Sequence, residues 1–469
     1  MSRDGGAAGG ARSLILHLGI GSFHRAHQAA YLQDLFDCGD ERWSLVSGNV
    51  RPGMEDTVRV LLEQQGRYTL ETVTPNGERR YRRIASLQRV LPFAPGLGPM
   101  LSVGSDPRTR IISFTVTEAG YYLDASGELD FSHPEIRADL DAVRAGGVGT
   151  TLYGTLAALL RERHLRSGTP VTLLCCDNLR SNGERSRTGL LQFLERTGDS
   201  ALLAWVRGAT SSPNAMVDRI TPRPDAALRE RVRAATGIPD AAPVMSEQFA
   251  QWVIEDRFCT DRPDWERVGV QMVSLVAPYE EAKIRILNAS HSVLAWAGAL
   301  LGHQYVHQAV RDPQVTQWVR AYVAEVVPCL TPSPIDLEAY LDATLERFGN
   351  AALADRLERI AQDSYAKLAT FVVPTICERL RRSNSLEGVA MLPALFLAYL
   401  QCWRRGGPRW SYRDDTLSQA DAIALAGTRD PVAALCADRG LWSEFAADAR
   451  LCTAVRLAQR RLQFGLAPP

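Results

Sequence analysis

The sequence predicts two domains of different class: an α/β domain with a mainly parallel sheet over residues 13–277, and an all-helical domain over residues 278–469. Three observations predict this division. In the first part, short apolar runs rich in β-branched residues alternate with helical patterns, which is typical of βαβ units. After about Pro278, helical patterns follow one another and strand signals become scarce. The length of 469 residues also suits two large domains.

Composition and charge argue against several classes of function. The chain carries 53 basic and 53 acidic side chains, and its pI is about 7.1. Without a basic excess, nothing attracts the chain to nucleic acid or to an anionic membrane surface. The sequence also lacks a stretch of about 20 predominantly apolar residues, the length needed to span a bilayer. We therefore expect no nucleic-acid partner and no membrane association.

The cysteines and the N-terminal segment indicate the compartment. The nine cysteines form no C-x-x-C pair, which predicts reduced thiols and a cytoplasmic protein. Residues 1–12 contain several glycines and no apolar run, so we expect a mobile tail and not a signal peptide. No cluster of histidine, cysteine and carboxylate residues has the spacing of a zinc site, so we expect no metal.

The first pair of elements is typical of a dinucleotide-binding, Rossmann-like domain. The apolar run Leu14–Leu18 predicts a strand, and the pattern His24–Phe36 predicts a helix after it. The G-x-G turn between them would let the backbone approach a pyrophosphate at the helix N-terminus. His24 replaces the third glycine of the usual G-x-G-x-x-G pattern, so a turn without a ligand is at least as consistent with the residues. The expected cofactor-binding residues of the turn are Gly19, Ile20, Gly21, Ser22 and Phe23.

Further strands continue the α/β pattern. A β-hairpin is predicted from Thr69–Val73 and Tyr81–Ser86, because Asn76-Gly77 between them suits a tight turn. The other short apolar runs that predict strands are Trp43–Gly48, Arg110–Thr117, Val171–Cys176 and Val268–Leu275.

The segment after the second strand is expected to determine whether the protein prefers NAD or NADP. A carboxylate there would bind the adenosine ribose of NAD, whereas a cation would favour a 2′-phosphate. Glu55 and Asp56 offer the carboxylates, and Arg51 offers the cation. We favour NAD, with Glu55 and Asp56 as its binding residues.

The second domain is predicted to consist of helices alone. Long stretches with helical spacing follow one another, and they are separated by short polar segments. The predicted helices are Pro278–Gly302, Pro313–Val327, Ile335–Phe348, Ala352–Ala361, Pro374–Arg382 and Ala390–Arg404.

The scarcity of lysine directs attention to two positions. Of the 53 lysine and arginine residues, only Lys283 and Lys367 are lysines. Arginine stays protonated in proteins, whereas a buried lysine can lose its proton and act as a base. Two surface lysines left by chance are an equally good interpretation of the count alone. The surroundings of each lysine decide between the two.

Lys283 begins a set of three polar residues on the first helix of the second domain. Asn288 and His291 follow it, and at 100° per residue they lie about 140° and about 80° around the helix from Lys283. An amine, an amide and an imidazole on one face of a buried helix suit alcohol oxidation. The amine could accept the hydroxyl proton and the amide could stabilise the developing alkoxide. The alternative is a satisfied polar contact between helices.

Other candidates are less specific on their own. Asn178 follows a predicted strand at the sheet edge where ligands bind in α/β folds. Lys367 and Arg359 could donate hydrogen bonds to several hydroxyls of a polyol, although surface charge near a helix end is the stronger interpretation without further observations.

Five segments in order along nearly the whole chain resemble the mannitol dehydrogenase family, the polyol-specific long-chain dehydrogenases. That family also has histidine in place of the third glycine, but commonly has glycine where this chain has Ala119. The segments are Gly19–His27 (GIGSFHRAH), Thr117–Tyr121 (TEAGY), Cys176–Leu179 (CDNL), Pro213–Pro222 (PNAMVDRITP), and Lys283 with Asn288 and His291.

The resemblance implies an activity and residue roles. It implies oxidation of a polyol to a ketose with NAD and without a metal. Four further segments favour the branch that converts D-arabinitol to D-xylulose: Trp43–Arg51, Arg67–Val73, Ile284–Gly298 and Met391–Phe396. By the motif match, Lys283 is the general base and Glu280 lies on a proton route. The implied oxyanion hole is Asn178 with Asn288, His291 orients the substrate, and the polyol is bound by Asp218, Arg359 and Lys367.

Three alternatives remain open at this point. The substrate could be mannitol, or a uronate such as fructuronate could be reduced, in which case an additional cation is expected in the pocket. A non-catalytic NAD-binding sensor would keep the fold without turnover. We expect small-molecule partners only, and a monomer or weak oligomer.

Overall fold

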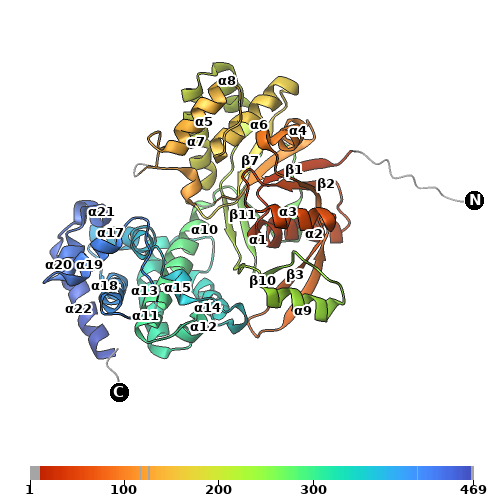
Figure 1. The fold of residues 1–469 in the computed structure, drawn as a ribbon. Coiled ribbons are helices and arrows are strands. Elements are labelled where there is room, and N and C mark those ends of the chain that lie inside the picture. Colours follow the sequence, from red (N-terminus) through yellow and green to blue (C-terminus); the bar gives the residue numbers. More distant parts are fainter. Residues whose placement is uncertain (1–10, 117, 125–126, 409, 466–469) are drawn as a thin grey trace, which may run out of the picture. The chain divides into compact units, whose positions relative to one another are not determined.

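The computed structural model describes residues 11–116, 118–124, 127–408 and 410–465 (Figure 1). The tail predicted over residues 1–12 therefore lies mostly outside the described residues. The chain divides into two units. One contains the chain up to Val73 together with Arg79–Ala277, and the other contains Thr74–Glu78 together with the chain from Pro278.

The first unit is built on a six-stranded sheet in the order β5-β2-β1-β6-β7-β8. All neighbouring strands run parallel, which confirms the predicted α/β class with a mainly parallel sheet. The strands are β1 Ser13–Leu18, β2 Trp43–Gly48, β5 Leu87–Leu91, β6 Thr109–Phe114, β7 Val171–Cys175 and β8 Thr210–Ser211.

Helices cover both faces of this sheet because its strands are apolar on both sides. In β1, Ile15 packs into one core with α1, α2 and α3, while Leu16 packs into a second core with α4 to α8. The two layers can be followed in Figure 1. The helices are α1 Ser22–Ala26, α2 Gln28–Asp37, α3 Glu55–Glu63, α4 Gly98–Ser105, α5 Pro134–Arg144, α6 Leu152–Arg166, α7 Asn182–Thr197, α8 Ser200–Ala209 and, beside a smaller sheet, α9 Ala226–Thr236.

Two three-stranded sheets complete the first unit. β3 (Tyr68–Val73) pairs antiparallel with β4 (Arg79–Ile84), which confirms the predicted hairpin, and β10 (Val244–Glu247) adds to β3. The other sheet contains β9 (Ala215–Asp218), β11 (Gln251–Glu255) and β12 (Gln271–Val273).

One predicted strand of the first unit is wrong in length. Only the middle of the segment Val268–Leu275 forms a strand, β12, because a 3-10 turn over Trp265–Val268 and Gly269 in the left-handed region (φ 93°) come before it. β12 pairs with β11 and lies outside the main sheet.

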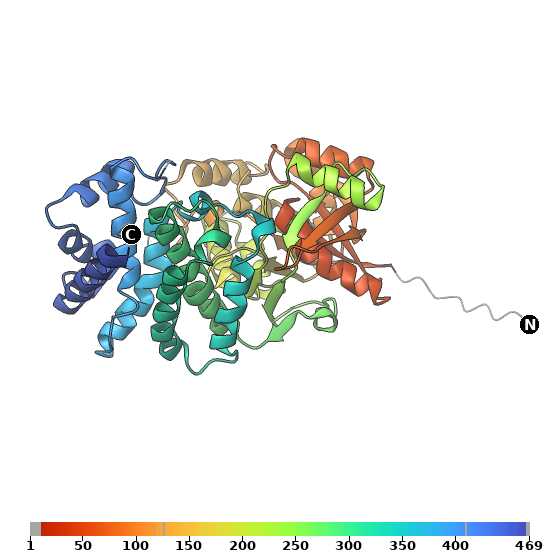
Figure 2. The same cartoon turned by 90° about the horizontal axis from the view of Figure 1, so that it is seen from below.

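The described part of the second unit contains helices and a single isolated bridge between Tyr305 and Arg356 (Figures 1 and 2). Its centre is α11, which is buried on most sides and packs against α12, α13, α15 and α18. No helix in the described residues combines the length and apolar character needed to cross a bilayer. The helices are α10 Ala277–Ala282, α11 Ala289–Leu300, α12 Val306–Ala309, α13 Pro313–Leu330, α14 Leu337–Phe348, α15 Leu357–Ile360, α16 Ser364–Lys367, α17 Val373–Arg381, α18 Met391–Arg404, α19 Gln419–Gly427, α20 Pro431–Cys436, α21 Arg439–Trp442 and α22 Ala449–Gly465.

Two predicted helices of this unit are interrupted. The segment Pro278–Gly302 changes from α10 to a π-helical turn over Lys283–Asn288 before α11 begins. The segment Ala352–Ala361 is not one helix either. Ala354 adopts a left-handed backbone (φ 48°), and the chain then pairs with Tyr305 before the short helix α15. A second π-helical turn, Leu368–Val372, follows α16 and packs against the first.

Candidate active site

The glycine turn after β1 has the backbone needed to approach a dinucleotide. Gly19 has φ +125°, a conformation that favours glycine, and its N–H donates to the carbonyl of Gly48 at 2.8 Å. A Cβ atom added to Gly21 would meet no heavy atom within 4 Å, so the turn is open on that side. Helix α1 begins directly afterwards at Ser22. An open glycine turn that leads into a helix fits the pyrophosphate of NAD.

His24 explains why the usual third glycine can be absent. Its imidazole stacks on that of His17 from β1, with ring centroids 3.5 Å apart and planes inclined by 7°. Both rings are buried, and Ser47 of β2 contacts His24 at 3.4 Å. The imidazole of His24 thus fills the space between α1 and β1. A glycine at this position would instead let the helix pack directly against the strand. Burial lowers the pKa of His17 to about 3, and burial together with the neighbouring His17 lowers the pKa of His24.

These buried histidines are expected to make the fold sensitive to mild acid. In the unfolded chain a histidine titrates near 6.5, so below that pH the unfolded state binds more protons than the folded state. For His17, stability is therefore lost as the pH falls from about 6.5 towards about 3, by about 2 kcal/mol at pH 5, and the lowered pKa of His24 acts in the same direction. We expect the urea midpoint to be clearly lower at pH 5.0 than at pH 7.5.

The matched variants test which residue causes this acid sensitivity. His17→Asn should reduce the difference between the two midpoints. His133→Asn is the control, because asparagine also caps helices well and His133 lies at the N-cap of α5. This variant should leave the difference between the two midpoints unchanged. Equal midpoints at both pH values for the unaltered protein would contradict the expectation.

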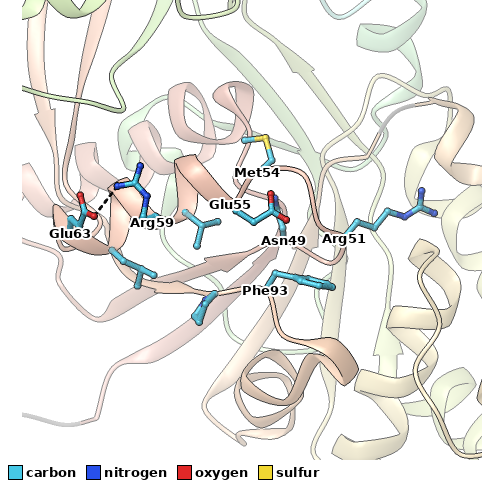
Figure 3. A pocket seen from close by; sticks show the side chains of 10 residues that line it. Asn49, Arg51, Met54, Glu55, Arg59, Glu63 and Phe93 are labelled. Atoms are coloured by element: carbon cyan, nitrogen blue, oxygen red, sulfur yellow. Dashed lines mark hydrogen bonds and ion pairs between the residues drawn. The ribbon is translucent and has the colours of Figure 1, made fainter.

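A cavity of about 310 Å³ lies at the carboxyl ends of β2 and β5 (Figure 3). This is the edge of a parallel sheet at which the adenosine part of a dinucleotide binds. Glu55 lines the cavity, and its carboxylate accepts a hydrogen bond from the N–H of Gly53 at 2.8 Å. Asp56 is not among the lining residues; its side chain is 98% exposed and pairs with Arg59. The lining residues are Asn49, Arg51, Met54, Glu55, Val58, Arg59, Leu62, Glu63, Pro92 and Phe93.

Arg51 is engaged elsewhere in the first unit. Its guanidinium donates to the carbonyl of Thr150 at 2.6 Å, to the hydroxyl of Tyr122 at 2.7 Å and to Glu135 at 2.8 Å. Figure 3 shows the guanidinium directed away from Glu55. These contacts favour the interpretation in which Arg51 does not bind a 2′-phosphate.

Asp177 organises the sheet edge next to Asn178. Its carboxylate accepts from the N–H of Val116 at 2.9 Å and from the hydroxyl of Tyr121 at 2.5 Å. The side chain of Asn182 donates to the carbonyl of Asp177 at 2.9 Å. Asp177 thereby joins the ends of β6 and β7, and leaves the neighbouring Asn178 exposed. Of the motif Thr117–Tyr121, Thr117 lies outside the described residues.

Asp218 is the other predicted polyol-binding residue of the first unit. It is buried at the end of β9, where it is paired in register with Gln251 of β11.

In the second unit, Lys283 and Asn288 lie at the two ends of the first π-helical turn. Hydrogen bonds in a π-helix link residues five apart, so these two positions are neighbours on one face. The separation of about 140° expected for an α-helix is therefore wrong here, because the backbone takes a wider turn. Lys283 and Glu280 are each 7% exposed. Burial disfavours the charged form of an amine, and isolated π-turns occur frequently at functional sites.

His291 lies one turn further along, in α11. Its ring stacks on Phe348 with centroids 4.4 Å apart, and its Nε2 atom lies 3.6 Å from Oδ2 of Asp355. Burial lowers the pKa of His291 to about 3, against the opposing effect of Asp355; Arg359, Lys367 and Arg347 lower it further. The imidazole is therefore neutral at physiological pH.

Arg359 and Lys367 are brought to the same region as His291. Arg359 donates to Asp355 through Nε at 3.0 Å and through Nη2 at 2.8 Å. Lys367 donates to the backbone carbonyls of Ile360 at 2.8 Å and Gln362 at 2.6 Å, in the loop that begins at the last residue of the helix carrying Arg359. Lys367 therefore holds this loop, a structural role that the sequence did not indicate.

Asp355 is the residue that the sequence interpretation missed. It touches both His291 and Arg359, yet no motif marked it. The only available signal was its position four residues before Arg359, a spacing at which opposite charges pair on a helix. No group of three or more potential metal ligands is present among the described residues.

Comparisons with known proteins agree with this architecture. Residues 13–267 match the mannitol dehydrogenase Rossmann domain, and residues 275–463 match the mannitol dehydrogenase C-terminal domain. A D-arabinitol 4-dehydrogenase from Ralstonia nicotianae is 51% identical over 96% of each chain. Another from Klebsiella pneumoniae is 46% identical over 94% of this chain and 96% of that protein.

A solved structure extends the comparison to three dimensions. The ternary complex of Pseudomonas fluorescens mannitol 2-dehydrogenase with NAD and D-mannitol aligns with a TM-score of 0.84 and 34% identity. The alignment covers 97% of this chain and 93% of that one.

Proposed function

The chain belongs to the mannitol dehydrogenase family, and from this premise we propose that it oxidises D-arabinitol to D-xylulose. It is an NAD-dependent polyol dehydrogenase. The observation that carries the choice of substrate is the near full-length similarity to two D-arabinitol 4-dehydrogenases, which exceeds the similarity to the mannitol 2-dehydrogenases.

The proposed chemistry divides among few residues. Bound NAD would supply the acceptor for the hydride of the carbinol carbon. Lys283 takes the hydroxyl proton on its Nζ atom, so the C–H and O–H bonds break and a C=O bond forms. Asn178 and Asn288 donate hydrogen bonds to the developing alkoxide, and the neutral His291 orients the hydroxyl. Glu280 is buried and lies three residues before Lys283 in the sequence, and it passes the proton onward from Lys283.

The remaining hydroxyls of the polyol are bound by three other residues. Arg359 donates hydrogen bonds to these hydroxyls while Asp355 holds its guanidinium in place. Lys367 donates to a hydroxyl as well as to the backbone carbonyls of the loop after Arg359. Asp218 accepts from a hydroxyl. The roles of Asn178 and Asp218 rest on the family motifs.

A panel of substrates tests the proposed function. With NAD, kcat/KM for D-arabinitol should exceed that for D-mannitol by about tenfold or more, because binding sites discriminate one extra carbon unit to that degree. L-Arabinitol, which has the same composition and the opposite configuration, is the control. A preference for D-mannitol would favour the mannitol 2-dehydrogenase activity. NADH-dependent reduction of fructuronate would favour the uronate reductase, and NAD binding without turnover of any polyol would favour a sensor.

Glu55 is expected to set the preference for NAD. As a carboxylate at the adenosine end of the cavity it would bind the ribose and repel a 2′-phosphate. We expect Glu55→Gln to raise the KM for NAD about tenfold and to narrow the preference over NADP. Glu63→Gln, which alters another carboxylate of the same helix and cavity, should leave both values nearly unchanged. An unchanged ratio of kcat/KM for NAD and NADP in Glu55→Gln would assign ribose recognition to another residue.

A further inference from the structure

We propose that Asp355 is a positioning residue for polyol oxidation: its carboxylate aligns Arg359 and fixes which nitrogen of His291 carries the proton. The inference rests on the proposed function, because Arg359 and His291 are proposed there to contact the polyol. No sequence motif marked Asp355, and its role follows from contacts within the second unit alone.

The first contact orients a side chain that would otherwise be mobile. The side chain of Arg359 is 63% exposed, whereas that of Asp355 is 11% exposed. An exposed arginine samples many rotamers, and ordering it costs conformational entropy. Hydrogen bonds from Nε and Nη2 to the partly buried carboxylate fix the plane of the guanidinium. A guanidinium has five N–H donors, so donors remain for substrate hydroxyls.

The second contact acts on the tautomer of His291. Its Nε2 atom is buried, and in the described part of the chain it has no hydrogen-bond partner. The nearest carboxylate oxygen, Oδ2 of Asp355, lies 3.6 Å away, which is longer than a hydrogen bond. A neighbouring negative charge favours the tautomer with its proton on Nε2. Nδ1 then carries the lone pair, so His291 accepts a hydrogen bond from the substrate hydroxyl.

The backbone around Asp355 is held independently of its carboxylate. Its carbonyl accepts from the N–H of Val306 at 2.9 Å, and the N–H of Leu357 donates to the carbonyl of Gln304 at 3.0 Å. The bridge between Tyr305 and Arg356 joins the same two segments. Removing only the charge of Asp355 should therefore leave the fold in place.

The chain offers a matched control pair. His303 and Asp312 lie in the same unit, with Nε2 and Oδ2 3.7 Å apart. Asp312 is also the N-cap of α13, and asparagine serves that position equally well. Asp312→Asn therefore repeats the chemical change of Asp355→Asn beside another histidine, away from Arg359.

The experiment compares Asp355→Asn, Asp355→Glu and Asp312→Asn in steady-state kinetics with D-arabinitol and NAD. We expect Asp355→Asn to lower kcat/KM for D-arabinitol about 10- to 100-fold, mainly through KM for the polyol, with an unchanged Kd for NAD. Asp355→Glu should recover part of the loss, and Asp312→Asn should behave like the unaltered protein. In an Arg359→Ala background, Asp355→Asn should cost less, because the two residues act together.

The outcomes separate this inference from the proposed function. If the unaltered protein oxidises D-arabinitol but Asp355→Asn keeps its KM, the inference on Asp355 is wrong and the function stands. An equal loss in the Asp312→Asn variant would also overturn it, and a loss in Asp355→Asn that is independent of Arg359 would overturn the alignment of Arg359. If the unaltered protein oxidises no polyol, the proposed function fails, and the role of Asp355 fails with it.

Discussion

Replacing Lys283 by arginine should lower kcat for D-arabinitol oxidation by about 10²- to 10⁴-fold, the usual contribution of a general base. The variant keeps a positive charge of similar length at a position that is 7% exposed. Arginine does not give up its proton in proteins, so it cannot accept one from the substrate hydroxyl. Steady-state rates at saturating NAD and polyol measure the effect.

The second lysine of the chain is the matched control. Lys367 donates hydrogen bonds to the carbonyls of Ile360 and Gln362, a task that an arginine can also perform. Lys367→Arg should therefore lose much less activity than Lys283→Arg, although it makes the same chemical change. Circular dichroism and the thermal unfolding midpoint check that both variants fold. Near-normal turnover in Lys283→Arg would remove Lys283 from the role of base.

Replacing Asn288 by alanine should have the next largest effect, a loss in kcat of about 10²- to 10³-fold. The amide is expected to donate to the oxygen of the substrate as negative charge develops on it, a contact that strengthens in the transition state. The π-helical turn supports this expectation because it places Asn288 on the face of Lys283. Rates and KM for D-arabinitol separate this effect from a loss of substrate binding.

Asn384→Ala provides the comparison for Asn288→Ala. Asn384 is an exposed residue of the same unit, after α17, and its backbone N–H donates to the carbonyl of Arg379 at 2.9 Å. We expect it to keep the kcat of the unaltered protein. If Asn288→Ala instead raised KM for the polyol without lowering kcat, Asn288 would serve ground-state binding and not the transition state.

Four of the six strands of the main sheet could be predicted because local residues mark them, whereas β5 (LQRVL) and the two-residue strand β8 were not predicted. Trp43–Gly48 (WSLVSG) and Val171–Cys175 (VTLLC) consist of apolar and small residues without charge, as expected for strands covered on both faces, and the structure buries both in the parallel sheet. The hairpin of β3 and β4 was also local, since Asn76-Gly77 marks its turn. Patterns of this kind need no knowledge of distant contacts.

The π-helical turns could not be predicted in the same way. The segment from Pro278 to Gly302 has the apolar content of a buried helix, and one wider turn inside it hardly changes that pattern. Ala352–Ala361 failed for a related reason: its residues favour helix, but pairing with Tyr305 imposes an extended segment. Tertiary contacts decide both cases.

Asp355 and His24 show the same limit at the level of single side chains. The proposed role of Asp355 depends on its contact with His291, which is 64 residues away in the chain. A single sequence does not reveal that the two side chains lie close together. His24 could be seen to replace a glycine, but its stacking on His17 depends on how the helix packs on the strand.

Both lysines stand directly at π-helical turns, and this arrangement has a spectroscopic consequence. Lys283 opens the first turn, and Lys367 immediately precedes the second. Protein grown with isotopically labelled lysine would show only two side-chain Nζ resonances, one from each turn. The ionisation state of the amine proposed as base could thus be followed directly by nuclear magnetic resonance, with the other amine as internal reference.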